Sequence, residues 1–143
     1  MPSHRIFLVL LVLCLVPTLP AFAEPAGLSA AEAYEKAAAD QLVLIDIRSP
    51  KEWRDTGIGV SATPISMHFP GFMEQVAEAT GGDTSRPVAL ICASGGRSSV
   101  VAPKLEEAGY TSIYNVAEGM LGGRYGKGWI PSGLPLKPYS PEP

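Results

Sequence analysis

The chain has 143 residues, with 14 acidic and 11 basic side chains and a net charge of −3. This length suits one compact domain, and the acidic balance without a basic run argues against nucleic acid as a partner. At the N-terminus, Arg5 precedes the apolar run 6–16 and the small-residue site 21–23. Because a membrane span needs roughly 20 apolar residues, the pattern predicts a signal peptide, residues 1–23, that is cleaved.

We therefore expect a periplasmic or secreted protein that begins at Glu24 and does not associate with the membrane after cleavage. Since Cys14 lies in the predicted signal peptide, the mature chain contains Cys92 alone and cannot form an internal disulfide. His68 is the only mature histidine, so the usual zinc clusters cannot be assembled. We expect neither a metal nor a cofactor. A lone thiol is either reactive or a small buried hydrophobic group, and its surroundings must decide.

The first elements after the signal peptide are a helix and a strand. Ser29 and Glu32 form the pattern of a capping box ahead of an alanine-rich helix at 30–38. The continuous apolar run 42–47 is typical of a strand that is buried on both faces. Such a strand indicates a parallel sheet.

Helical and strand patterns then alternate along the chain. We predict, in order, a helix at 50–55 capped by Ser49, a strand at 65–69, a helix at 72–79, a strand at 88–91, a helix capped by Ser98 or Ser99 that runs to Ala108, and a strand at 113–116. This order favours an α/β fold, a mainly parallel open sheet flanked by helices on both faces. Beyond Gly119 the chain is rich in Gly and Pro, which indicates a covering segment. We place the domain at 24–136 and a Pro-rich tail at 137–143.

The loop after the strand at 88–91 lies where open α/β sheets bind ligands, beyond the carboxyl ends of the strands. It consists of Cys92, Ala93, Ser94, Gly95, Gly96, Arg97 and Ser98. The two glycines allow several backbone N–H groups to converge into an anion cradle, and the helix N-terminus should lower the pKa of the Cys92 thiol. Arg97 can bind an oxyanion or stabilise the terminal sulfur of a persulfide.

This loop resembles the active-site loop of the rhodanese family. The segment 46–53 is similar to the strand-to-helix signature of that family, and the segments 115–120, 128–129 and 133–135 are similar to its C-terminal signature. The resemblance, which spans 30–135, implies that Cys92 takes sulfane sulfur from a donor such as thiosulfate. It then passes this sulfur to a thiophilic or thiol acceptor, which includes a sulfur-accepting protein. The resemblance also suggests that Asp46 and Arg48 brace the loop, although a solvated strand end fits the residues equally well.

Two alternative functions stay open. One is a sulfur-trafficking module that receives a persulfide from a partner and shows little turnover with small molecules. The other is a small cysteine phosphatase or arsenate reductase, but those enzymes usually have five residues between cysteine and arginine, and here four separate Cys92 from Arg97. The shorter loop favours a cradle for one extra sulfur atom over one for phosphate. A Ser-His-Asp triad built on His68 is disfavoured.

Three features depart from the family pattern. The segment 57–62 replaces the usual Gly-His-Ile-Pro-Gly-Ala run, so the path of the loop there is left open. Pro103 falls inside a predicted helix, where it removes a backbone hydrogen bond at a cost of about 3 kcal/mol. Ala93 stands where a charged residue often follows the loop cysteine, so attraction for a dianionic donor would rest on Arg97 and the backbone dipoles.

Overall fold

The computed structural model describes residues 26–141, so the predicted signal peptide lies outside the described residues. The elements are β1 (Ala26–Leu28), α1 (Ala30–Ala38), β2 (Val43–Asp46), α2 (Pro50–Thr56), β3 (Ile58–Gly59), β4 (Ala62–Pro64), α3 (Phe72–Thr80), β5 (Val88–Ile91), α4 (Gly96–Glu107), β6 (Ile113–Val116) and β7 (Leu136–Lys137). Within these residues, no helix has the length and apolar character needed to cross a membrane.

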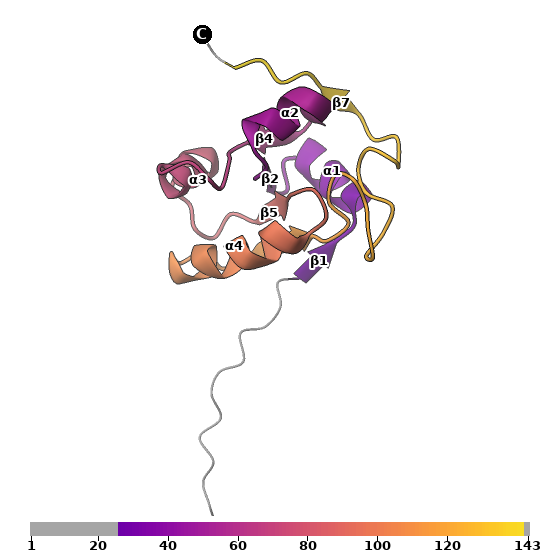
Figure 1. Cartoon of the computed structure of the whole chain (residues 1–143). Helices are drawn as coiled ribbons and strands as arrows, with labels where there is room; N and C mark the ends of the chain where they lie inside the picture. The colour runs from indigo at the N-terminus through magenta and orange to yellow at the C-terminus, as the bar shows by residue number, and fades with distance from the viewer. Residues whose placement is uncertain (1–25, 142–143) are drawn as a thin grey trace, which may run out of the picture.

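The main sheet is parallel throughout, in the order β1-β6-β5-β2-β4. The strands β2 and β5 lie at its centre and every residue of both is buried, which is why their sequences are continuous apolar runs. Helices α3 and α4 cover one face, whereas α1 and the segment after β6 cover the other (Figure 1). The predicted α/β class is confirmed.

Side-chain caps set the start of two helices. Ser29 and Glu32 form a reciprocal capping box at α1, and Ser49 and Glu52 form another at α2, where Pro50 takes the first helical position. Each box satisfies backbone N–H groups that the first helical turn leaves without partners. Both predicted caps are confirmed.

The strand predicted at 65–69 is wrong, because β4 covers Ala62–Pro64 and shares no residue with it. The N–H groups of Ile65 and Met67 still donate to the carbonyls of Asp46 and Ile47, at 3.0 and 3.2 Å, but the chain then turns. The apolar residues Ile65 and Met67, which suggested a strand, contact the core just beyond the end of β4. As β4 is an edge strand, its proline removes no bond that the ladder needs.

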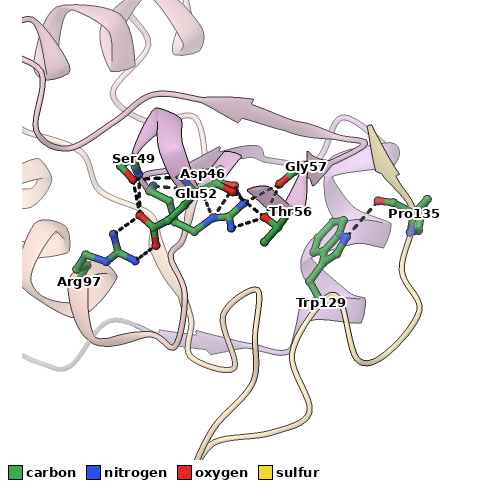
Figure 2. A network of polar contacts seen from close by, with 9 residues as sticks. Asp46, Ser49, Glu52, Thr56, Gly57, Arg97, Trp129 and Pro135 are labelled. Carbon is green, nitrogen blue, oxygen red and sulfur yellow. Dashed lines mark hydrogen bonds and ion pairs between the residues drawn. The ribbon is translucent and has the colours of Figure 1, made fainter. Parts of the chain in front are cut away.

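The open stretch 57–62 forms β3 in its first half, and β3 pairs with β7 in a separate antiparallel ribbon. The boundary expected between residues 136 and 137 therefore falls inside β7, and Tyr139 beyond it packs on Trp53 with ring centroids 5.0 Å apart. Figure 1 shows this last segment passing beside α2. Trp129 holds the segment before it through a 3.1 Å hydrogen bond from Nε1 to the Pro135 carbonyl (Figure 2).

Helix α4 also differs from its prediction. It begins at Gly96, with Gly95 as N-cap and no side-chain cap, instead of starting after Ser98 or Ser99. A glycine in the left-handed region can end the loop and start the helix earlier than a serine cap would. The helix runs on through Pro103 to Glu107.

Candidate active site

Cys92 follows β5 directly and lies at the carboxyl edge of the sheet, at the floor of the loop that leads into α4. Its side chain is 1% exposed. The N–H of Gly95 donates to Sγ over 3.2 Å, so the loop curls its backbone around the sulfur. The sulfur thus has a backbone donor in place within the loop itself.

Gly95 is the residue that permits this curl. Its φ is +88°, and a Cβ there would overlap the carbonyl oxygen of Ala117. The side-chain amide of Asn115 donates to the Gly95 carbonyl over 3.3 Å and holds the turn from behind. Gly96 has no such need, because a Cβ there meets nothing within 4 Å and its φ is not positive. Of the two predicted loop glycines, therefore, only Gly95 is required by backbone geometry.

The segment after β6 fixes the front of the loop. The N–H of Met120 donates to the Cys92 carbonyl at 2.8 Å, and the N–H of Leu121 donates to the Ala93 carbonyl at 2.9 Å. Gly119 makes this approach possible, since its φ is +66° and a Cβ would overlap the Ala93 carbonyl. The loop is therefore held from behind by Asn115 of β6 and from the front by the segment after β6.

The N-terminus of α4 leaves its positive dipole end available to the sulfur of Cys92. It has no side-chain cap and no acidic residue in its first turn, so its N–H groups and dipole favour a negative charge. Burial raises the pKa of the Cys92 thiol, but hydrogen bonds from the Ser98 hydroxyl and from the N–H groups of Ser98, Ser94 and Gly95 lower it. The net result is a pKa below the ordinary value, which favours the thiolate.

The hydroxyl of Ser98 is fully buried, and among the described residues no atom, the Cys92 sulfur included, lies in hydrogen-bonding geometry to it. An unpaired buried hydroxyl costs about 1–3 kcal/mol, so a fold keeps one only where something compensates. Because this hydroxyl lowers the pKa of the Cys92 thiol, an ionised sulfur is the group that can accept its hydrogen bond. Ser98 was predicted as part of the loop, and the structure buries it beside the sulfur.

The charge of Cys92 contributes to the raised pKa of Arg97, but the hydrogen bonds of the guanidinium go to α2 and not to the loop. The guanidinium pairs with both carboxylate oxygens of Glu52 on α2, at 2.9 and 2.6 Å (Figure 2). Hydrogen bonding to Arg97 lowers the pKa of Glu52 to about 2, and the same contact raises the pKa of Arg97. The oxyanion role of Arg97 stays a prediction, because its terminal nitrogens are engaged elsewhere.

Glu52 is the functional neighbour that the sequence analysis missed. One of its oxygens also accepts hydrogen bonds from the N–H and hydroxyl of Ser49, at 2.9 and 2.8 Å. Its contact with Ser49 is a capping box within three residues, whereas nothing in the sequence pointed to a second partner 45 residues away. The pair links the starts of α2 and α4.

Asp46 and Arg48 are not a solvated strand end, since their side chains are 0% and 1% exposed and pair at 2.8 Å. Arg48 also donates to the hydroxyl of Thr56 and the carbonyl of Gly57, at 2.8 and 2.9 Å (Figure 2). These partners lie at the end of α2, and none belongs to 92–98. The pair therefore braces the β2–α2 connection, which in turn positions Glu52.

The remaining predicted loop residues lie at the rim. Ser94 and Gly96 are exposed and Ala93 is half-buried. Nowhere in residues 26–141 do three or more His, Cys, Asp or Glu side chains gather as a metal site would require. The chemistry that the loop supports is that of a buried, stabilised thiolate.

A family model for the rhodanese-like domain matches residues 29–123. The chain belongs to the rhodanese-like domain family. The match includes the β2–α2 connection, the loop at 92–98 and the segment that anchors it. Among curated relatives, this rhodanese-like chain is 28% identical over 102 residues to an uncharacterized RP600 homolog of Rickettsia rickettsii, which covers 67% of this chain and 83% of that protein.

Solved structures agree with the assignment. The polysulfide-sulfur transferase homodimer of Wolinella succinogenes superposes with a TM-score of 0.64, is 26% identical, and is matched over 82% of both chains. Rv0390 from M. tuberculosis gives 0.62 at 28% identity, over 80% of this chain and 98% of that one. A Rhodopseudomonas palustris protein described as a possible tyrosine phosphatase gives 0.55 at 22% identity, over 79% and 85%, and shows the shared fold alone.

Proposed function

We propose that this rhodanese-like domain is a sulfurtransferase that carries sulfur as a persulfide on Cys92. The observation that carries the proposal is the loop geometry: a buried sulfur with a lowered pKa, surrounded by backbone N–H groups and the Ser98 hydroxyl. The similarity to a polysulfide-sulfur transferase supports the same chemistry.

The first step uses a sulfane donor such as thiosulfate. The Cys92 thiolate attacks the outer sulfur of the donor, so that a Sγ–S bond forms while the donor's S–S bond breaks and sulfite leaves with the electron pair. The negative charge moves from Sγ to the terminal sulfur. The terminal sulfur lies one bond beyond Sγ. The N–H groups that stabilise the thiolate can therefore stabilise the persulfide as well.

The second step returns the enzyme to its starting state. A thiophilic acceptor such as cyanide, or the thiol of a small molecule or protein, attacks the terminal sulfur. The Sγ–S bond breaks and its electron pair restores the Cys92 thiolate. No oxidant, metal or second cysteine is needed, and this agrees with the single cysteine of residues 24–143.

The geometry gives less support to phosphate chemistry. A phosphoryl group carries spread negative charge and is usually held by an arginine as well as by backbone amides. Here the guanidinium of Arg97 is occupied by Glu52, and the loop between Cys92 and Arg97 is short. A single extra sulfur atom is smaller than a phosphoryl group and needs fewer hydrogen-bond donors from the loop.

We further propose that the protein acts after export, in the periplasm or outside the cell. The basic start, the apolar run 6–16 and the small-residue site 21–23 support this location. An oxidising compartment would threaten an exposed thiol, and the 1% exposure of Cys92 protects it.

The deciding experiment is the intact mass of the purified protein before and after treatment with thiosulfate, with Cys92→Ser as the matched control. We expect a gain of one sulfur atom in the wild type and none in the variant. Cyanide should then remove the sulfur as thiocyanate.

Two results would change the assignment. No mass gain with thiosulfate, polysulfide or any other sulfane donor would overturn the proposal. A persulfide that forms but is not discharged by cyanide or small thiols would reassign the protein as a sulfur-trafficking module that serves a protein partner.

A further inference from the structure

Arg97 is the only charged side chain in the loop at 92–98, and it lies in the first turn of α4. Its pKa is raised chiefly by its hydrogen bond to Glu52 and then by the charges of Glu52 and Cys92. The guanidinium therefore lies within electrostatic reach of the sulfur. An anion that approaches the sulfur would be attracted by this cation if no counter-charge offset it.

Glu52 supplies that counter-charge from the neighbouring helix α2. Its two carboxylate oxygens accept hydrogen bonds from both terminal nitrogens of Arg97, at 2.6 and 2.9 Å (Figure 2). The side chains of Arg97 and Glu52 are 31% and 32% exposed, so water screens the pair only in part. Oε2 of Glu52 also accepts from the N–H and the hydroxyl of Ser49, at 2.9 and 2.8 Å. The helix cap thus fixes the carboxylate at the place where it holds the guanidinium.

The other charged groups near the loop leave this balance to Glu52. Asp46 also acts on the pKa of Arg97, after Glu52 and Cys92, but its carboxylate pairs with the buried Arg48 at 2.8 Å. In the sheet, β6 and β2 lie on opposite sides of β5. Arg124, from the segment after β6, lines a cavity on the β6 side of the loop, whereas Glu52 belongs to the helix that follows β2. The contribution of Arg124 is therefore separate from that of the Glu52–Arg97 pair.

We propose that Glu52 is a positioning residue that sets the charge selectivity of the donor step. Because it holds the guanidinium of Arg97, it disfavours dianionic sulfane donors and favours donors with one negative charge or none. The inference rests on the proposed function and concerns its first step, in which the Sγ–S bond forms and the leaving group departs with the electron pair of the donor's S–S bond. Thiosulfate still reacts, but more slowly than it would with a freed Arg97.

The test compares iodoacetate with iodoacetamide, two alkylating reagents of nearly equal size that differ by one negative charge. The second-order rate constant for Cys92 is measured with each reagent at pH 7 and low ionic strength, and Cys92→Ser defines the background. The ratio of the two constants reports the charge selectivity of the site. Access to the buried sulfur and the fraction of thiolate affect both reagents alike and cancel in this ratio.

Glu52→Gln should raise the ratio of iodoacetate to iodoacetamide roughly three- to fivefold, the effect of one partly exposed charge that has lost its partner. Glutamine also serves at this position of a capping box, so the start of α2 is kept. The rise should nearly vanish in about 1 M salt, where charges are screened within about 3 Å. Asp55→Asn removes an exposed carboxylate from the same helix and should leave the ratio near that of the wild type.

Two further measurements separate a role through Arg97 from other effects. On an Arg97→Gln background, Glu52→Gln should change the ratio by less than about twofold, because no guanidinium is left to release. The rate of persulfide formation from thiosulfate, divided by the rate with iodoacetamide, should rise in Glu52→Gln by more than the iodoacetate ratio does. Thiosulfate carries two negative charges and iodoacetate carries one.

Rates that change equally for both alkylating reagents would show that Glu52 only shapes the loop and would overturn the inference. An unchanged ratio, or a rise of the same size on the Arg97→Gln background, would overturn it as well. So would a thiosulfate rate that gains nothing although the wild type forms a persulfide. A wild type that forms no persulfide refutes the proposed function alone, and the alkylation ratios then still decide whether Glu52 controls charge selectivity at Cys92.

Discussion

The β2–α2 and β5–α4 connections lie side by side at the carboxyl edge of the sheet and treat their helix starts in opposite ways. At α2, the capping box satisfies the N–H groups of Ser49 and Glu52, and Pro50 at the first helical position has no N–H to satisfy. At α4, Gly95 is the N-cap and no side chain caps the helix, so the donors turn to the sulfur of Cys92. The two starts are joined by the Glu52–Arg97 pair.

A helix start without a side-chain cap keeps its backbone N–H groups available to bind a negatively charged ligand. The β2–α2 connection stabilises the fold and positions Glu52, because its polar groups form hydrogen bonds with each other. The conformation of the β5–α4 connection depends on contacts with neighbouring segments, and its backbone N–H groups stay available to a negatively charged sulfur. Substitutions at the first connection should therefore change stability, and those at the second should change reactivity.

The largest effect is expected from Asp46→Asn in the capped connection. It would leave the buried guanidinium of Arg48 without its counter-charge and should lower the free energy of unfolding by about 3–5 kcal/mol. Chemical denaturation measures this value. The control Asp55→Asn breaks an exposed pair with Lys51 and should cost less than about 1 kcal/mol. Equal losses would show that burial does not govern these pairs.

Gly95→Ala should affect both stability and reactivity. The new Cβ would adopt an unfavourable positive φ and overlap the Ala117 carbonyl, at a cost of about 2–4 kcal/mol. Because the N–H that faces Sγ would shift, persulfide formation should fall in parallel. Gly96→Ala is the matched control, since it adds the same methyl group into open space. If both variants behave alike in denaturation and in the mass assay, the loop has another conformation.

The Glu52–Arg97 ion pair, which joins the two connections, should lose its contribution to stability at acid pH. Since the pKa of Glu52 is lowered to about 2 in the folded state, its contribution is fully present above about pH 4.5 and is lost as the pH falls toward 2. We expect the wild type to exceed Glu52→Gln in stability by about 1–2 kcal/mol at pH 6, after allowance for screening, and by almost nothing near pH 2. Denaturation at both pH values tests this.

The matched control for that experiment is Glu78→Gln on the exposed side of α3, where no ion pair is formed. Its difference from the wild type should stay small and constant between the two pH values. A Glu52→Gln difference that persists at pH 2 would mean that the ion pair is not its source.

The smallest effect on stability, with a clear effect on reactivity, is expected from Ser98→Ala. Loss of the buried hydroxyl should raise the pKa of the Cys92 thiol and lower its alkylation rate by iodoacetamide at pH 7 by roughly three- to tenfold. Thr80→Val removes a buried hydroxyl that bonds Tyr110, away from the sulfur, and should leave the rate unchanged. An unchanged rate in Ser98→Ala would assign the lowered pKa to the backbone alone.

Much of this molecule could be predicted from local sequence. The two capping boxes, the buried strands β2 and β5 and the position of Cys92 after β5 follow from contacts within a few residues, or from a run whose apolar character requires burial on both faces. Such short-range rules act before the chain is packed. The α/β class and the candidate loop at 92–98 could therefore be predicted without a structure.

Tertiary structure decided the rest, because those features depend on residues that are distant in sequence. Glu52 pairs with Arg97 across 45 positions, and Gly95 requires its left-handed turn because the Ala117 backbone lies against it. The bounds of β4 depend on its pairing with β2, and β3 forms only because the chain returns at β7. The sequence by itself identified Cys92 as the candidate thiol, because it follows a buried strand directly, and packing determined which groups surround it.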